Sequence, residues 1–155
     1  MSGARFRYAL EPVRLTRTWH LDALLLELGE QNGAIASHAL AQADIEARIA
    51  QAAAGWEERK VSGRFQSVTE FALTTRYMSD LARQARDASD RMAELAVQRD
   101  ATIERVVLAK RAVEAAEAHR DEMHAAFIRQ RLSADFKLAD DQWNTLQSGA
   151  IAHDS

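Results

Sequence analysis

Histidines are the residues of this chain best suited to metal binding or to proton transfer near neutral pH. The sequence has five of them and no cysteine. No two histidines are four residues apart, the spacing that places two ligands on one face of a helix. The two nearest in sequence fall on different helical faces, so we expect no metal site. The histidines are His20, His38, His119, His124 and His153.

Catalytic and nucleotide-binding motifs are also missing from the sequence. It contains no glycine-rich loop followed by lysine, no predicted strand to carry one, and no cysteine nucleophile. The sequence therefore predicts a protein that is not an enzyme, with no catalytic residues, no cofactor-binding residues and no cofactor.

The composition indicates an all-α fold. Hydrophobic residues make up 47% of the 155 residues, but aromatic residues make up only 6%, and there is a single proline. Alanine dominates the apolar residues, and this favours thin helical packing over a deep globular core. We expect one helical-hairpin domain covering residues 1–155.

The balance of charges limits the possible partners. The 20 basic and 23 acidic side chains are interspersed and give a net charge of −3, so we expect no nucleic-acid partner. The longest apolar run, from Leu21 to Leu28, is interrupted by charges and is too short to span a membrane. The first residues lack a hydrophobic signal segment, so a soluble, unprocessed, cytoplasmic protein is expected.

A heptad pattern runs through the second half of the chain without a change of frame. Only Thr74, Arg99, Thr102 and Arg120 interrupt its apolar character. We call this set the second seam: Phe71, Thr74, Met78, Leu81, Ala85, Ala88, Met92, Leu95, Arg99, Thr102, Val106, Ala109, Val113, Ala116, Arg120, Met123 and Phe127.

The first half has a similar seam, although "LELGEQNGAI" at residues 26–35 contains two glycines. The apolar frame before Gly29 and Gly33 is the same as the frame after them, which a turn would have no reason to preserve. We therefore predict a helix that passes through both glycines. The first seam consists of Leu21, Leu24, Leu28, Gln31, Ile35, His38, Gln42, Ile45, Ile49, Ala52 and Trp56.

Capping signals give approximate ends for both helices. Pro12 suits a first helical turn and Gly55 a helix end, so the first helix is expected over about 12–54. A turn follows over about 55–66. "SVTE" at 67–70 is a capping box, and the second helix is expected over about 67–140, with a flexible tail over about 144–155.

The two seams are expected to face each other in an antiparallel coiled coil with a longer C-terminal helix. One plausible register sets Ile45 opposite Ala85, Leu24 opposite Val106, and the polar residues Gln31 and Arg99 together. Met123, Phe127 and Ile128 then project past Pro12, unless Phe6 and Tyr8 fold back over them. Trp56 is either a binding anchor or a plug at the end of the coil.

The sequence resembles the FliJ/YscO family, small stalk proteins of flagellar and virulence-associated type III export machines. The resemblance covers about Phe6 to Trp143. It rests on the opening "FRYALEPVRLTRTWHLDALLLELGEQ", on "GRFQSVTEF" before the second helix, and on the hairpin layout. The opening includes the spaced arginines Arg5, Arg7, Arg14 and Arg17.

The resemblance implies a non-enzymatic central stalk that binds a hexameric export ATPase and an export gate protein, and that also handles export chaperones. It implies a cytoplasmic location, peripheral to a membrane-embedded export machine. The ATPase-binding residues would be Arg14, Arg17, Met123 and Phe127. The gate-binding residues would be Phe71, Thr75 and Met78, although Thr75 is polar where the family has an aliphatic residue.

Two other functions are compatible with the same pattern. The chain could be a homo-oligomeric coiled-coil scaffold in which the projecting seam residues pair with a second copy. It could also be an export chaperone escort that holds substrates between its helix ends. The sequence does not distinguish a flagellar from a virulence-type system.

Overall fold

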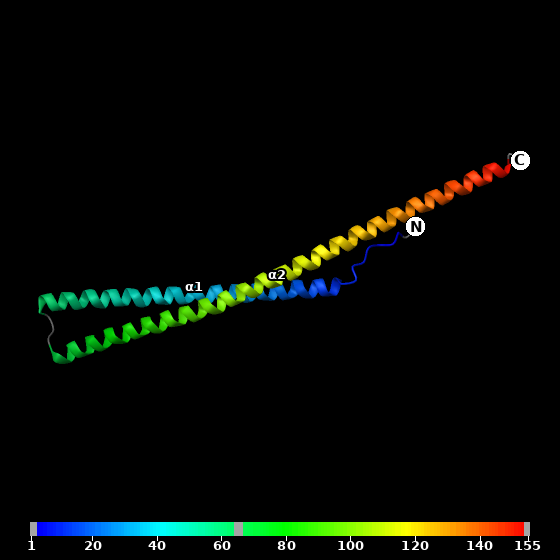
Figure 1. The fold of residues 1–155 in the computed structure, drawn as a ribbon. Helices are drawn as coiled ribbons and strands as arrows, with labels where there is room; N and C mark the ends of the chain where they lie inside the picture. Colours follow the sequence, from blue (N-terminus) through cyan, green and yellow to red (C-terminus); the bar gives the residue numbers. More distant parts are fainter. Residues whose placement is uncertain (1–2, 64–66, 154–155) are drawn as a thin grey trace. The chain divides into compact units, whose positions relative to one another are not determined.

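The computed structural model describes residues 3–63 and 67–153, and within them the chain is all-α. Helix α1 spans Glu11–Ser62 and helix α2 spans Val68–His153 (Figure 1). The described residues contain no strand. The predicted helical hairpin with a longer C-terminal helix is confirmed. Residues 64–66 of the expected turn lie outside the described residues.

Helix α1 passes through Gly29 and Gly33 without a break, as the preserved seam frame predicted. A Cβ atom added at either glycine would meet nothing within 4 Å. Neither glycine is therefore required by a close approach of another segment. Each lowers helix stability by about 1 kcal/mol relative to alanine, a cost that the continuous seam outweighs.

The predicted end of the first helix near Ala54 is wrong, because α1 continues to Ser62 and Gly55 lies inside it. The residues after Gly55 include good helix formers such as Glu57, Glu58 and Lys60, which offset the cost of one glycine. The helix ends before Gly63, whose φ of 65° is the left-handed conformation common just after a helix.

The start of α2 agrees with the predicted capping signal. The Ser67 hydroxyl accepts a hydrogen bond from the Glu70 backbone N–H at 3.1 Å. The far end of α2 was predicted wrongly, because the helix continues past Asp140 as far as His153. No proline follows Pro12, so nothing in the expected tail stops a helix that is already formed.

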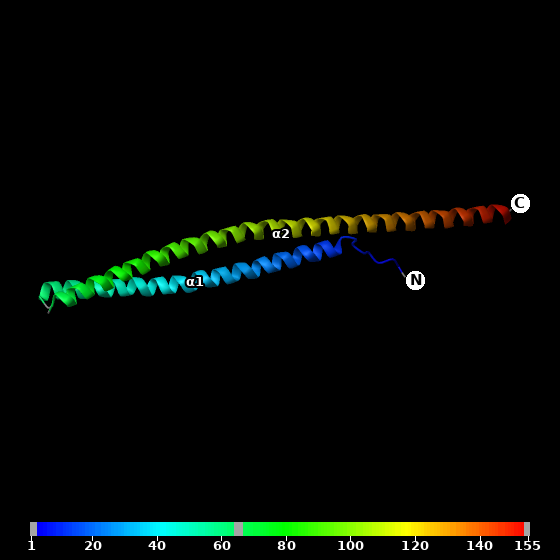
Figure 2. The ribbon, with the colours of Figure 1, turned by 90° about the horizontal axis from the view of Figure 1, so that it is seen from below.

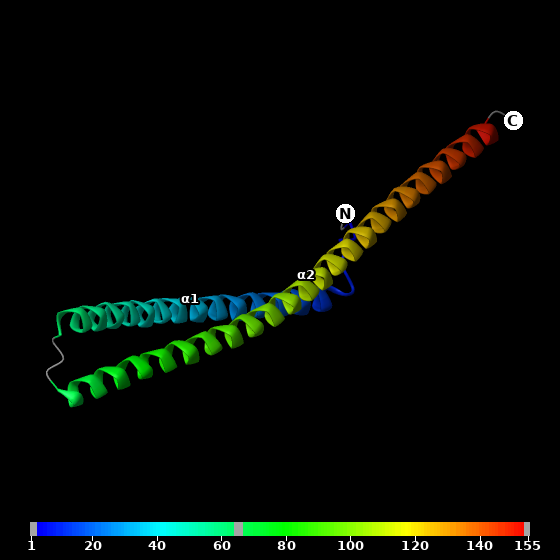
Figure 3. The ribbon, with the colours of Figure 1, turned by 60° about the vertical axis from the view of Figure 1, so that its left-hand side comes forward.

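The contacts divide the chain into two units. We call residues Asp22–Val107 the hairpin unit, and Met1–Leu21 together with Leu108–Ser155 the terminal unit. Each helix contributes to both. In the hairpin unit α1 and α2 run in opposite directions (Figure 3). Its buried side chains all belong to the two predicted seams: Leu24, Leu81, Leu95 and Thr102.

One contact in the hairpin unit lies close to the predicted seam register. The Arg105 guanidinium lies 3.5 Å from the Glu27 carboxylate, one turn from the predicted layer of Leu24 and Val106. The expected pairing of Gln31 with Arg99 does not satisfy Gln31, whose Oε1 is buried without a hydrogen-bond partner among the described residues. Arg99 donates to the adjacent Asp100 instead, at 3.0 Å.

The terminal unit is held together by small seam residues of α2. Ala109, Val113 and Ala116 are buried there, against the first turns of α1. The Arg17 guanidinium donates from Nη1 to the carbonyl of Ala112 at 3.1 Å. The chain before α1 is irregular and runs along α2 (Figure 2).

Most seam positions are at least half-buried, and the exceptions have a pattern. His38 is exposed in the first seam, and Phe71, Arg120 and Met123 are exposed in the second. Three of these four lie toward the ends of the second seam, where the packing of one helix on the other decreases. Neither helix is long and apolar enough, within the described residues, to cross a membrane.

Candidate functional site

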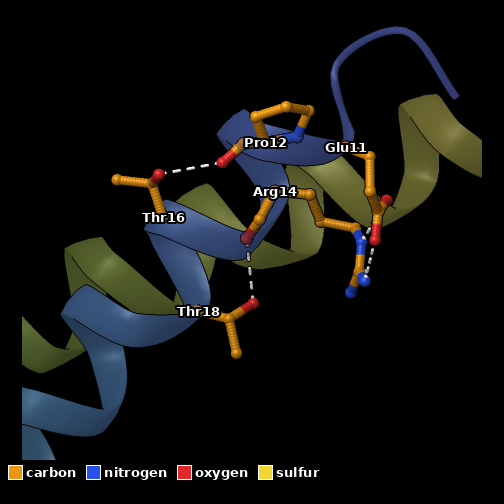
Figure 4. A network of polar contacts seen from close by, with 5 residues as sticks. All are labelled: Glu11, Pro12, Arg14, Thr16 and Thr18. Carbon is orange, nitrogen blue, oxygen red and sulfur yellow. Dashed lines mark hydrogen bonds and ion pairs between the residues drawn. The ribbon is translucent and has the colours of Figure 1, made fainter.

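The two arginines assigned to the ATPase-binding end lie on the first turns of α1. Arg14 donates to both carboxylate oxygens of Glu11, with Nε to Oε2 at 2.8 Å (Figure 4). The Arg14 carbonyl accepts the Thr18 hydroxyl at 2.9 Å, and the Pro12 carbonyl accepts the Thr16 hydroxyl at 2.8 Å. The Arg14 side chain is therefore fixed in place by its own helix.

The pairing of Arg14 with Glu11 shifts the pKa of both side chains. The pKa of Glu11 is below its ordinary value of 4.5, mainly because Arg14 donates hydrogen bonds to the carboxylate. The same hydrogen bonds raise the pKa of Arg14. Arg120 of α2 adds a further attraction for the Glu11 carboxylate. Both groups stay charged through the neutral pH range, and the turn presents a fixed ion pair.

Phe127 and Met123 differ in how far they are covered. Phe6 folds back over α2, and its ring lies 5.7 Å from the Phe127 ring and 4.9 Å from His124. Phe127 is consequently half-buried, whereas Met123 remains 45% exposed. The sequence left open whether the projecting residues would be covered. The structure shows that Phe6 covers Phe127.

Tyr8 makes a second attachment between the N-terminal segment and α2. Its hydroxyl is 2.6 Å from His119 Nδ1, and its ring lies 5.6 Å from the imidazole. An open groove of about 520 Å³ lies beside these contacts, between residues 3–6 and the stretch of α2 from His124 to Asp135. The sequence did not indicate this groove, because an irregular segment has no periodicity to reveal where it docks.

The residues assigned to the gate-binding end lie on α2 in the hairpin unit. Phe71 is 46% exposed, and its ring lies 5.0 Å from that of Trp56 in α1. Thr75 is exposed, and its hydroxyl donates to the Phe71 carbonyl at 2.9 Å. Met78 is half-buried in the seam. Phe71 and Thr75 therefore form the accessible part of this group, and Trp56 extends it onto α1.

Each predicted group of binding residues thus lies within one unit. Arg14, Arg17, Met123 and Phe127 belong to the terminal unit. Phe71, Thr75 and Met78 belong to the hairpin unit. Within the described residues, no three His, Asp or Glu side chains are grouped closely enough to hold a metal ion. His119 and His124 instead contact the N-terminal segment.

One surface was missed by the sequence analysis. Beyond Phe127, every described residue of α2 is exposed, including Phe136, Trp143 and Leu146. The sequence predicts a flexible tail over about 144–155, and that prediction assigns no helical face to the apolar residues there. Their three-and-four spacing was the signal that could have revealed the surface.

Comparisons with protein-family models, with curated proteins and with solved structures give no match for this chain. The resemblance to the FliJ/YscO family therefore stays a prediction from the sequence.

Proposed function

We propose that this chain is a non-enzymatic stalk component of a bacterial type III protein export apparatus. In this proposal it binds the hexameric export ATPase and the export gate protein, handles export chaperones, and works in the cytoplasm beside the membrane-embedded machine. The observation that carries the proposal is the hairpin unit. Within the described residues it consists of two continuous helices, which pack along seams whose buried side chains are Leu24, Leu81, Leu95 and Thr102.

A pair of helices is thin enough for a role inside a ring. The terminal unit, to which the ATPase contacts are assigned, contains such a pair, because Arg17 of α1 donates to Ala112 of α2. Two helices of about 10–12 Å each give a cross-section on the order of 20 Å. A pair of unlike helices cannot make equal contacts with all subunits of a symmetric ring. It would therefore bias the nucleotide states of the subunits differently, which is a coupling between binding and hydrolysis.

The terminal unit supplies the contacts proposed for the ATPase. In this unit Arg17 lies on α1 and the exposed Met123 on α2, and Arg14 is held by Glu11. Exposed cationic and apolar side chains of this kind are common in interfaces that combine steering with an apolar contact. The gate contact is proposed for Phe71 and Thr75 in the hairpin unit.

The decisive experiment adds the purified chain to the purified export ATPase of the same cell and measures ATP hydrolysis and binding. We expect complex formation and faster hydrolysis. A chain that neither binds the ATPase nor stimulates it would overturn the proposal.

Two variants test the assigned ATPase-binding end. Met123→Glu should weaken the stimulation about 10-fold or more, because it places a charge in an apolar contact. Val97→Glu is the matched control, since Val97 is an exposed apolar residue of α2 in the hairpin unit. Equal losses in both variants would argue against a contact at Met123.

A separate pair of variants tests the gate-binding end. Thr75→Arg should weaken binding to the gate protein and leave ATPase stimulation unchanged. Val97→Arg is the control, because Val97 is an exposed residue of α2 in the same unit and lies far along the helix from Phe71 and Thr75. Loss of both activities in Thr75→Arg would contradict the assignment of two separate ends.

A further inference from the structure

The C-terminal part of α2 carries a continuous apolar stripe. Its first residue, Leu132, lines the groove beside residues 3–6, and the rest of the stripe lies beyond that groove. Its residues are separated by four, three, four, three and four positions, which places them on one side of the helix. In Figures 1 and 2 no other segment of the terminal unit lies beside the last part of α2, drawn in red. We call this set the C-terminal stripe: Leu132, Phe136, Ala139, Trp143, Leu146 and Ala150.

The C-terminal stripe is not a continuation of the seam that packs against α1. The frame of Met123 and Phe127 leads next to Gln130, Ala134, Lys137 and Asp141, which are mostly polar. The apolar side of α2 therefore changes after Phe127. One side of α2 is apolar up to Phe127, and a different side is apolar from Leu132 onward. Such a helix can pack against one neighbour before Phe127 and against another neighbour after it.

The area of the stripe is sufficient for a modest interface with another helix. Phe136, Trp143 and Leu146 leave 72%, 62% and 70% of their surface exposed. Large aromatic side chains bury about 150–250 Å² each, so covering the stripe would remove roughly 500 Å² per helix from water, or about 1,000 Å² for a pair of stripes. That total is near the lower limit of about 1,000 Å² for a specific protein interface.

The sizes of the stripe residues fit a second copy of the same stripe in the opposite direction. In an antiparallel pair centred on the layers of residues 139 and 143, Trp143 faces Ala139 of the partner subunit. Leu132 then faces Ala150 of the partner subunit, and Phe136 faces Leu146 of the partner subunit. Each tryptophan and each outer leucine meets an alanine, and Phe136 meets a leucine. No layer therefore contains two tryptophans or two alanines, which favours even packing.

A parallel pair would pack much less evenly. Each residue would face its own copy, so a layer with two tryptophans at position 143 would follow a layer with two alanines at position 139. Thick and thin layers in succession leave either voids or clashes between two straight helices. The size pattern of the stripe therefore favours the antiparallel arrangement.

The charges beside the stripe favour the same arrangement. Asp135 and Asp140 flank it on opposite sides. In a parallel pair, positions five residues apart on opposite flanks meet, so Asp135 would lie beside Asp140 of the partner subunit on both sides. In the antiparallel pair Asp135 faces Gly149 of the partner subunit, and only Asp140 approaches its own copy. The antiparallel pair thus contains one repulsive contact instead of two.

We infer that the C-terminal stripe is a dimerisation surface, on which two copies of this chain form an antiparallel helix pair. Interfaces near the lower size limit are commonly weak or transient, so a dissociation constant on the order of micromolar is expected. The free chain is then a monomer at low concentration and a dimer at high concentration.

The first test is the mass of the full chain in solution, measured by sedimentation over a range of concentrations. We expect twice the 17.3 kDa chain mass at high concentration. Trp143→Asp should weaken the dimer about 30-fold or more, because it places a charge in the central layer. The inference would be overturned if the chain remained monomeric at protein concentrations about 100-fold above the expected micromolar dissociation constant.

Leu138→Asp is the matched control for this variant. Leu138 lies on the same stretch of α2 and is 58% exposed, but it is on the side away from the C-terminal stripe. The control should dimerise like the unchanged chain. Circular dichroism of both variants shows whether the helix is retained. If both substitutions weakened the dimer equally while the helix was retained, the stripe would not be the interface.

The second test determines the orientation and uses the absence of cysteine from the chain. Two single-cysteine variants, Leu132→Cys and Ala150→Cys, are mixed and mildly oxidised. The antiparallel pair places these positions opposite each other, so a disulfide-linked heterodimer is expected. Ala139→Cys alone should not cross-link, because position 139 faces position 143. Efficient cross-linking of Ala139→Cys to itself would indicate a parallel pair and overturn the inference.

This inference does not rest on the proposed export function, and the experiments separate the two. A chain that dimerises without stimulating an ATPase would remove the stalk proposal and retain the dimer. A chain that stimulates the ATPase and stays monomeric would support the stalk proposal and remove the dimer. Where both hold, a chain that enters a ring as one copy must first release its partner, so dimerisation would limit the supply of active chains.

Discussion

The hairpin unit and the last part of α2 use the same helix for different purposes. In the hairpin unit, Leu81, Leu95 and Thr102 of α2 are buried against α1. From Phe136 to His153, every residue of α2 is exposed. Both stretches have apolar residues at helical spacing, so the spacing alone does not predict whether a helix face is buried within the chain. A face of α2 is buried only where α1 lies against it.

The largest expected difference between these regions is in the contribution of a single leucine to stability. Leu24→Ala should lower the free energy of unfolding by about 2–5 kcal/mol, because Leu24 is only 2% exposed and its loss leaves a cavity. Chemical denaturation followed by circular dichroism measures this change. Leu146→Ala should leave the stability of the monomer nearly unchanged.

Leu26→Ala is the control within α1, since Leu26 is 67% exposed. Its effect should stay within about 0.5 kcal/mol. Similar losses for Leu24→Ala and Leu26→Ala would contradict the burial pattern on which the comparison depends.

A buried polar group in the hairpin unit provides the next test. Gln31→Leu should raise the free energy of unfolding by about 1–2 kcal/mol, because it removes a buried oxygen that lacks a hydrogen-bond partner. The measurement is the shift of the denaturation midpoint. Gln51→Leu, at an exposed position, should change little. A loss of stability in Gln31→Leu would indicate that the amide has a role that its contacts do not reveal.

Substitution of alanine for glycine in the hairpin unit should raise the stability of the folded chain at two positions and lower it at a third. Gly29→Ala and Gly33→Ala should each stabilise the chain by about 0.5–1 kcal/mol, because both are helical and have open space around the added methyl group. Gly63→Ala should cost about 1 kcal/mol, because its φ of 65° disfavours a side chain. Thermal unfolding distinguishes the two outcomes, and a shift of the same sign at all three positions would be unexpected.

The smallest expected effect concerns Glu11 in the terminal unit. Its pKa is lowered by Arg14, so the ion pair stabilises the folded chain fully above the ordinary value of 4.5. That contribution is lost as the pH falls through the lowered pKa. Titration of the Glu11 carboxyl by NMR should give a midpoint below 4.5 in the unchanged chain. In Arg14→Ala the midpoint should move back toward 4.5, and an unchanged midpoint would disprove the assigned cause.

The sequence predicted the features that depend on periodicity. The phase shared by Leu24, Leu28 and Ile35 across the two glycines predicted a continuous α1, and the second seam predicted which residues of α2 are buried. Helix ends were predicted less well, because Gly55 and the polar residues near Asp140 lower helix stability without preventing helix formation.

Contacts made by irregular segments were beyond the reach of the sequence. Phe6 and Tyr8 are attached to α2 through His124 and His119, which are more than 100 positions away along the chain. No local pattern encodes such a pairing. The assigned binding residues rest on a resemblance to a family, and no periodicity or spacing in the sequence indicates their roles.

The uncovered end of α2 also has a kinetic consequence. From Phe136 to His153 the helix is maintained by its own backbone hydrogen bonds, without packing against α1. Local opening there requires no buried surface to be exposed, so amide hydrogens should exchange with solvent much faster than those near Leu81 and Leu95. One continuous helix would then show two very different degrees of protection. A bound second copy would slow exchange only along the uncovered stretch.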